Sequence, residues 1–130
     1  MKLFLFFIDG FGLGRSDPAV NPFLRARMPN LQSLLGGRTM VAESFPLEGP
    51  LAWGVATDAT LEVPGLPQSA TGQTTILTGV NASKALGWHM NAHPTPTLKK
   101  ILNEQSIFKR VAEAGLLPGF LNAYRPEVFN

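Results

Sequence analysis

The sequence predicts an α/β fold built on a mostly parallel β-sheet. The chain begins with a continuous apolar run, Leu3–Ile8, whose lack of polar alternation is typical of a strand buried on both faces. Two short amphipathic segments, Thr97–Glu104 and Ser106–Ala114, have apolar residues at helical spacing. A second apolar stretch, Gly119–Tyr124, follows them and indicates another buried strand. Because helix and strand alternate in this way, we expect βαβ units and helices that pack on the sheet.

Length, charge and composition narrow the possible functions. A chain of 130 residues is long enough for one domain with a real core, and we expect a single domain over 1–130. Cysteine is absent, which excludes disulfides, thiolate catalysis and thiolate zinc sites. The net charge of +2 is too small to favour a nucleic acid or an anionic membrane as partner. The first apolar run is too short to cross a membrane and no cleavage pattern follows it, so we expect a cytoplasmic protein.

The first predicted strand ends at Asp9, which is followed by a G-x-G-x-G run over Gly10–Gly14. In open α/β sheets, ligands bind just beyond the carboxyl ends of the strands. A carboxylate in that position is a natural ligand for a divalent cation, so Asp9 is a candidate metal ligand. Two alternatives are an aspartate that only forms a turn and a dinucleotide-binding turn. The latter requires G-x-G-x-x-G followed by a helix, and this run has a different spacing and no clear helix after it.

Proline interrupts residues 15–29, which we expect to form a surface loop. A short helix is predicted over Asn30–Leu35, with Asn30 as its N-cap and a glycine pair after it. Two segments, Arg38–Phe45 and Leu51–Leu61, are predicted to be extended.

The most informative stretch runs from Pro67 to Thr75 and leads into a predicted helix over Ala70–Thr78, with Ser69 at the N-cap. A helix start offers unpaired backbone N–H groups and the positive end of the macrodipole, so anions bind there readily. Serine at this position is either a simple cap or a nucleophile that faces a bound phosphate. Gly72 and three threonines are more than a cap requires, which favours the second interpretation.

Both histidines, His89 and His93, lie in a predicted loop over Asn81–Pro94. Their spacing of four residues suits two metal ligands on one face of a helix. Gly87 and Pro94 flank them and make a regular helix doubtful, so metal ligation competes with a loop or substrate role.

A strand that ends in Asp9-Gly10 and the loop Ser69–Gln73 together resemble the N-terminal part of the alkaline phosphatase superfamily. Within it, the chain is most similar to the branch of cofactor-independent phosphoglycerate mutase and phosphopentomutase. The resemblance implies a three-layer α/β sandwich, with Asp9 as a metal ligand and Ser69 as both nucleophile and metal ligand. The nucleophile motif of that branch is hydroxyl-x-x-Gly-His, and Gln73 stands here in place of the histidine. This departure argues against either mutase and favours a less characterised relative.

The resemblance also implies a reaction and its cofactors. Two divalent cations, zinc or manganese, would activate the serine, and a phosphoserine intermediate would form from a small phosphorylated substrate. The backbone of Ala70 and Thr71, together with His89, would hold the phosphate. Because the superfamily takes most of its metal ligands from later in the chain, the resemblance implies that 1–130 is the partial, N-terminal portion of a larger metalloenzyme and is inactive alone.

Two other functions remain open. The chain is alternatively a non-catalytic α/β module that binds an anion, or a nucleotide-binding domain built on its glycine run. In a partial domain an apolar sheet edge or face would be exposed, so copies of the chain are expected to associate through it.

Overall fold

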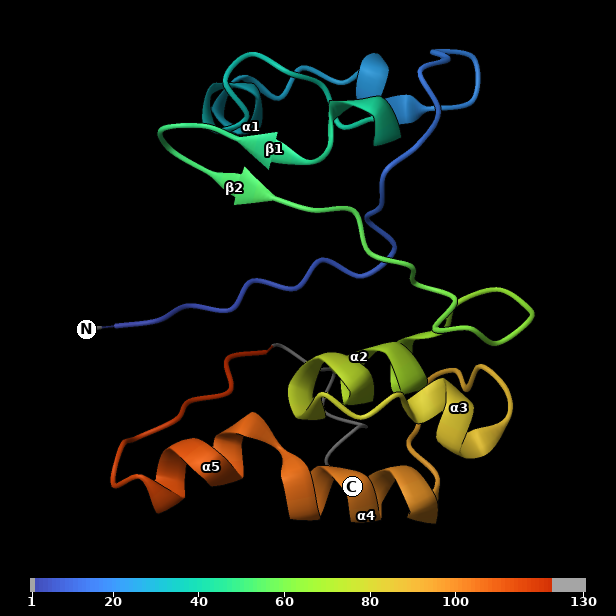
Figure 1. The fold of residues 1–130 in the computed structure, drawn as a ribbon, viewed down its shortest axis with the longest axis vertical. Helices are drawn as coiled ribbons and strands as arrows, with labels where there is room; N and C mark the ends of the chain where they lie inside the picture. The colour runs from blue at the N-terminus through green and yellow to red at the C-terminus, as the bar shows by residue number, and fades with distance from the viewer. Residues whose placement is uncertain (1, 123–130) are drawn as a thin grey trace. The chain divides into compact units, whose positions relative to one another are not determined.

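The computed structural model describes residues 2–122 and contains two compact units, Met1–Asp58 and Ala59–Asn130 (Figure 1). Each unit has its own secondary structure and its own buried side chains, and each is described by itself below. The first contains a short helix and a hairpin, and the second contains helices.

The predicted three-layer α/β sandwich with a mostly parallel β-sheet is wrong. The described residues are 36% helix and 5% strand, and they contain no parallel sheet. Their one sheet is an antiparallel hairpin in the first unit, made of β1 (Leu47–Glu48) and β2 (Trp53–Gly54). Of the predicted extended segment Leu51–Leu61, only β2 is a strand. A two-residue ladder offers no surface on which helices can pack in layers, so the helices of this chain bury their apolar faces against one another.

The first predicted strand, Leu3–Ile8, is not a strand, and its side chains are between 45% and 88% exposed. A buried strand needs neighbouring strands for its N–H and C=O groups, and no strand among residues 2–122 pairs with this one. The second predicted strand, Gly119–Tyr124, is also irregular over its described residues, 119–122, and its last two residues lie outside the described part of the chain. Association of copies through exposed apolar side chains stays a prediction.

The first α-helix begins one residue earlier than predicted and has a different N-cap. The helix α1 spans Pro29–Leu34, and Met28 is its N-cap in place of Asn30, because Pro29 fits the first helical position. The segment Arg38–Phe45, predicted to be extended, contains a short 3-10 helix. The buried apolar side chains of this unit are Leu35, Val41 and Leu47.

A buried asparagine organises the loop that follows the glycine run. The Asn21 side chain accepts a hydrogen bond from the N–H of Phe23 at 3.1 Å and donates to the carbonyl of Arg15 at 2.9 Å. A Cβ atom at Gly14 would lie 2.6 Å from the Asn21 amide nitrogen, so only glycine fits there. The last glycine of the run therefore serves packing. No α-helix follows the run before α1, and the helix start that a dinucleotide-binding turn requires is not present at this place.

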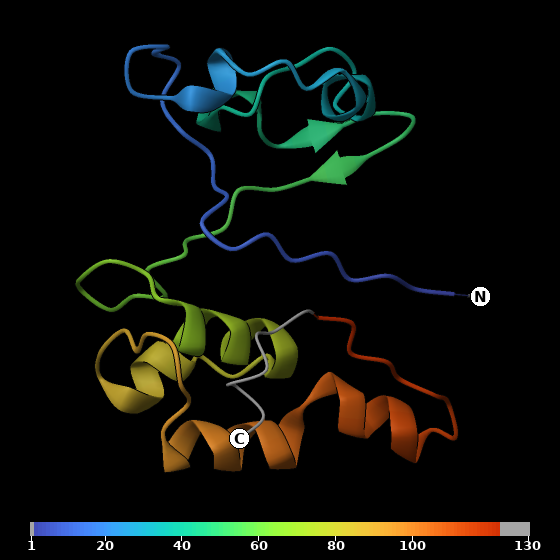
Figure 2. The ribbon, with the colours of Figure 1, turned by 180° about the vertical axis from the view of Figure 1, so that it is seen from behind.

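Four helices make up the described part of the second unit. They are α2 (Ser69–Thr78), α3 (Ala82–Leu86), α4 (Pro96–Gln105) and α5 (Ile107–Glu113). Both views of the ribbon show α2 beside α4, and α2 also contacts α3 and α5 (Figures 1 and 2). None of the helices within residues 2–122 has the length and apolar content that crossing a membrane requires.

The sequence located three of these helices to within two residues, because their end signals are local. Thr95 and Ser106 cap α4 and α5 through their side chains, and Gly79 and Gly115 end α2 and α5 in the left-handed conformation. The helix α3 lies inside the segment that was predicted to be a loop. Its signals were an asparagine cap at residue 81 and a left-handed glycine at residue 87, which bracket only five helical residues.

The core of the second unit forms where α2, α3 and α4 meet. Leu98 of α4 and Ala82 of α3 are fully buried, and Ala70 of α2 is nearly so. The half-buried side chains packed around them are Leu86, Met90 and Ile101. Burying a leucine side chain is worth about 1.5–3 kcal/mol, which makes Leu98 the largest apolar contribution in this cluster.

Replacing Leu98 by alanine should lower the free energy of unfolding by about 2–5 kcal/mol, because the cavity left between α2 and α4 cannot collapse completely. Urea denaturation followed by circular dichroism measures this change. The control is Leu117→Ala, since Leu117 is 100% exposed and its loss should leave the unfolding midpoint unchanged. Equal effects of the two substitutions would contradict the assignment of Leu98 to the core.

Candidate functional site

Ser69 is the first residue of α2, one position later than the predicted N-cap, which is Gln68. Ser69 is half-buried, and its hydroxyl donates a hydrogen bond to Oδ1 of Asn91 at 3.1 Å. The N–H of Ala92 is shared between Oδ1 of Asn91 at 2.7 Å and the Ser69 hydroxyl at 3.3 Å. These contacts differ from those of a capping serine, whose oxygen accepts from an N–H within its own helix. The hydroxyl therefore faces a neighbouring segment of the chain and leaves the N–H groups of α2 to other acceptors.

The N–H groups that were predicted to hold a phosphate already have an acceptor. Both Ala70 and Thr71 donate to the carbonyl oxygen of Met90, at 3.0 and 3.3 Å. The N–H of Met90 in turn donates to the Thr71 hydroxyl at 3.3 Å. Two N–H groups that converge on one oxygen are the arrangement that an anion would use at a helix start. Here a carbonyl of the same chain occupies it.

A small open pocket of about 170 Å³ lies beside the Ser69 hydroxyl. Its lining comes from three places: α2 (Ser69, Ala70, Gln73, Thr74 and Leu77), the segment before α4 (Ala92 and Pro94) and α4 itself (Leu102). Ligand pockets usually enclose about 300–1,000 Å³. This pocket therefore has room for one small group and not for a whole drug-sized ligand.

The threonines of α2 have structural roles that explain their number. The hydroxyls of Thr74 and Thr78 donate to the carbonyls four residues earlier at 2.7 and 2.6 Å, which satisfies them inside the helix. Thr75 does the same and also accepts from the N–H of Ala82, the first residue of α3. These hydroxyls satisfy their hydrogen bonds within α2 or connect α2 to the start of α3, so their abundance is not by itself a sign of catalysis.

Asp9 lies at an exposed turn in the first unit, after the irregular apolar run. The sharing of a cation by Asp9 and Ser69 stays a prediction. Within residues 2–122, no group of three or more His, Cys, Asp or Glu side chains is arranged to hold a metal ion. One carboxylate and one hydroxyl are too few ligands for two divalent cations.

Both ring nitrogens of His89 form hydrogen bonds with other residues of the chain. Nε2 lies 3.0 Å from the carbonyl oxygen of Val63, which can only accept, so Nε2 carries the proton of this hydrogen bond. Nδ1 lies 3.2 Å from the hydroxyl of the fully buried Ser83 in α3. Both ring nitrogens therefore have partners within the chain, and contact of His89 with a substrate phosphate stays a prediction. His93 is exposed and, like His89, lies outside the helices.

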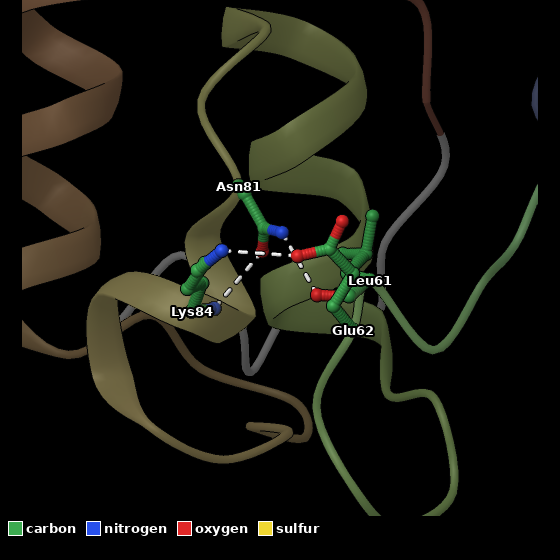
Figure 3. Close-up of polar contacts among 4 residues, drawn as sticks. All are labelled: Leu61, Glu62, Asn81 and Lys84. Carbon is green, nitrogen blue, oxygen red and sulfur yellow. Dashed lines mark hydrogen bonds and ion pairs between the residues drawn. The ribbon is translucent and has the colours of Figure 1, made fainter.

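A polar junction beside α3, missed by sequence reasoning, fixes the approach to α2 (Figure 3). Asn81 uses both ends of its amide, because Oδ1 accepts from the N–H of Lys84 at 2.9 Å and Nδ2 donates to the carbonyl of Leu61 at 2.8 Å. Lys84 forms an ion pair with Glu62 at 3.0 Å. Leu61 and Glu62 have φ values of 54° and 62°, a backbone conformation that residues other than glycine rarely adopt. The contacts of Asn81 and Lys84 therefore hold a strained turn in place.

The chain was compared with protein families, curated proteins and solved structures. No protein-family model matches the chain, and no match was found among curated proteins or solved structures.

Substitutions of Asn81 should separate its two contacts. Asn81→Asp keeps the cap of α3 but loses the donor to Leu61, and should cost about 1 kcal/mol of unfolding free energy. Asn81→Ala loses both contacts and should cost about 2 kcal/mol. Urea denaturation of the two variants and of the unchanged chain measures both losses.

Lys84→Met is the control for this pair, because both partners of its ion pair are well exposed, at 68% and 73%. Such pairs contribute about 0–1 kcal/mol. If Lys84→Met lowered the free energy of unfolding as much as Asn81→Ala does, the ion pair and not the asparagine would stabilise this junction.

Proposed function

We propose that Ser69 is the nucleophile of a metal-dependent phosphoryl-transfer enzyme of the alkaline phosphatase superfamily type, with Asp9 as one metal ligand and a small phosphate monoester as substrate. The observation that carries the proposal is the place of the Ser69 hydroxyl, at the first residue of a ten-residue helix and on the wall of the pocket. The sequence resemblance over Ser69–Gln73 supplies the reaction class.

The reaction begins with attack of the serine oxygen on phosphorus, which forms a bond to Oγ while the bond from phosphorus to the leaving-group oxygen breaks. The serine proton leaves and the leaving oxygen gains a proton. A water molecule then displaces the phosphoryl group in a hydrolase, or a substrate hydroxyl does so in a mutase. Divalent cations, zinc or manganese, would supply charge neutralisation for such a step. The described residues do not form a site for them, so we assign no step to metal here.

Gln73 is the second polar group that the pocket offers to a substrate. It lies one turn after Ser69 on the same face of α2, and both line the pocket. Its amide can donate to a phosphate oxygen without a change of charge between pH 5 and 9, unlike a histidine in that position. The size of the pocket matches a single phosphate group better than a complete nucleotide.

The second candidate function is non-catalytic anion binding in the same pocket. The contact that favours it is the hydrogen bond from Ser69 to Asn91, because an amide oxygen accepts the serine proton without acting as a base. Both functions place an anion beside Ser69, and only the first predicts a covalent bond to it.

Phosphoserine formation at Ser69 tests the proposal. The assay uses the full-length protein that contains these residues, with Mn²⁺ or Zn²⁺ and a phosphate monoester. We expect turnover of the ester and, after rapid quenching, a phosphorylated Ser69 peptide in mass spectrometry. Ser69→Ala should reduce turnover by at least about a thousandfold, because removal of a nucleophile usually costs more than that. The matched control is Ser33→Ala, on the exposed face of α1, which should leave the rate unchanged.

Residues 1–130 alone are expected to give no turnover. Full turnover of the Ser69→Ala protein, or a label on another residue, would overturn the proposal. Phosphate binding that survives Ser69→Ala without any covalent label would favour the anion-binding alternative.

A further inference from the structure

We propose that two copies of this chain associate by antiparallel pairing of the segment Leu3–Ile8, with Leu5 of one copy opposite Leu5 of the other. The inference concerns residues of the first unit only. It goes beyond the function proposed for Ser69 and does not depend on it, since it involves neither that serine nor the pocket beside it.

The segment Leu3–Ile8 has the composition of a strand but has no strand to pair with. Its six residues are leucine, phenylalanine and isoleucine, without proline, glycine or charge, which is typical of segments that pair with identical segments. Each of the six is at least 45% exposed. Within the described part of the chain, residues 3–7 form no backbone hydrogen bond, so their N–H and C=O groups are open to a partner strand.

The charges at the two ends of the segment favour the antiparallel direction. Lys2 precedes it and Asp9 follows it, and among residues 2–122 neither forms an ion pair. Parallel pairing in register would place lysine beside lysine and aspartate beside aspartate, and like charges opposite each other are destabilising. Antiparallel pairing instead brings the positive end of each copy to the negative end of the other. The segment is therefore complementary in charge to a second copy of itself.

Two-fold symmetry limits the register of such a pair. Side chains alternate between the two faces of a strand, and residues opposite each other in a sheet lie on the same face. In a symmetric antiparallel pair, one residue must therefore lie opposite its own copy. The residues at the middle of the segment are Leu5 and Phe6, and each defines one register.

The register centred on Leu5 suits the flanking charges better. It places Lys2 of one copy opposite Ile8 of the other, and a lysine can lay its aliphatic stem on an apolar neighbour while its amine stays in water. Centring the pair one residue later would place Leu3 opposite the carboxylate of Asp9, whose short side chain has no such stem. The charges thus select the first register.

Sedimentation velocity of the 130-residue chain tests for association. A two-stranded ribbon is only marginally stable, so we expect a reversible monomer–dimer equilibrium with a dissociation constant on the order of 10–100 µM. Leu5→Lys places two positive charges opposite each other and should raise this constant at least about tenfold. The control is Leu117→Lys, because Leu117 is 100% exposed in the second unit and its substitution should leave the constant unchanged.

Disulfide crosslinking tests the direction and the register, since the chain contains no cysteine of its own. Leu5→Cys brings two sulfur atoms opposite each other and should give a covalent dimer under mild oxidation. Leu3→Cys alone should not, because the two copies of residue 3 would lie about 14 Å apart, and a disulfide spans Cα atoms up to about 7 Å apart. A mixture of Leu3→Cys and Phe7→Cys should crosslink, which shows that the first of these variants still pairs.

Exchange of the end charges tests the complementarity. Lys2→Glu makes both ends of the segment acidic and should raise the dissociation constant about two- to tenfold at low salt. Addition of Asp9→Lys to this variant makes the two ends opposite in charge again and should return the constant to that of the unchanged chain.

The outcomes separate a second copy from other partners. A chain that stays monomeric at every concentration would overturn the proposal and leave the segment to another molecule. Equal crosslinking of Leu3→Cys and Leu5→Cys would indicate parallel pairing and overturn the assigned direction. Loss of association on Leu117→Lys would move the contact to the second unit. None of these measurements involves turnover, so their results stand whether or not Ser69 acts as a nucleophile.

Discussion

The first turn of a helix leaves backbone N–H groups without partners inside the helix, and in α2 these groups are satisfied by a distant part of the same chain. The carbonyl of Met90 accepts from Ala70 and Thr71, and this contact fixes the loop after α3 against the start of α2. The orientation of Ser69 depends on it, because the same loop brings Asn91 to the serine hydroxyl. The pocket depends on it as well, since Ala92 and Pro94 of that segment line it together with residues of α2.

The polar side chains of α2 have two kinds of surroundings. Its threonine hydroxyls form hydrogen bonds within the helix, with the N–H of Ala82 in α3 and with the N–H of Met90. Ser69 and Gln73 line the pocket together with Thr74. His89, which was predicted to contact the substrate, forms hydrogen bonds within the chain at both ring nitrogens, to Ser83 and to Val63. Residue type alone did not separate these roles.

The sequence predicted the helices well and the sheet wrongly, for one physical reason. Thr95 and Ser106 act on N–H groups within three residues, and Gly79 ends its helix by its own conformation, so these signals can be read locally. The run Leu3–Ile8 carries the apolar pattern of a buried strand, but a strand exists only where another strand pairs with it. No strand within residues 2–122 does so, and the pattern therefore gave the wrong answer.

By itself, the sequence determined the ends of α2, α4 and α5 and placed Ser69 at a helix start, since capping and periodicity act over a few residues. Only the tertiary structure decided what that helix start contacts. The partners of Ser69 and of the adjacent N–H groups lie about twenty residues further along the chain, and no local pattern encodes such a contact. It arises because Leu98, Ala82 and Ala70 must be buried together, and this packing carries the Met90–Ala92 segment onto α2.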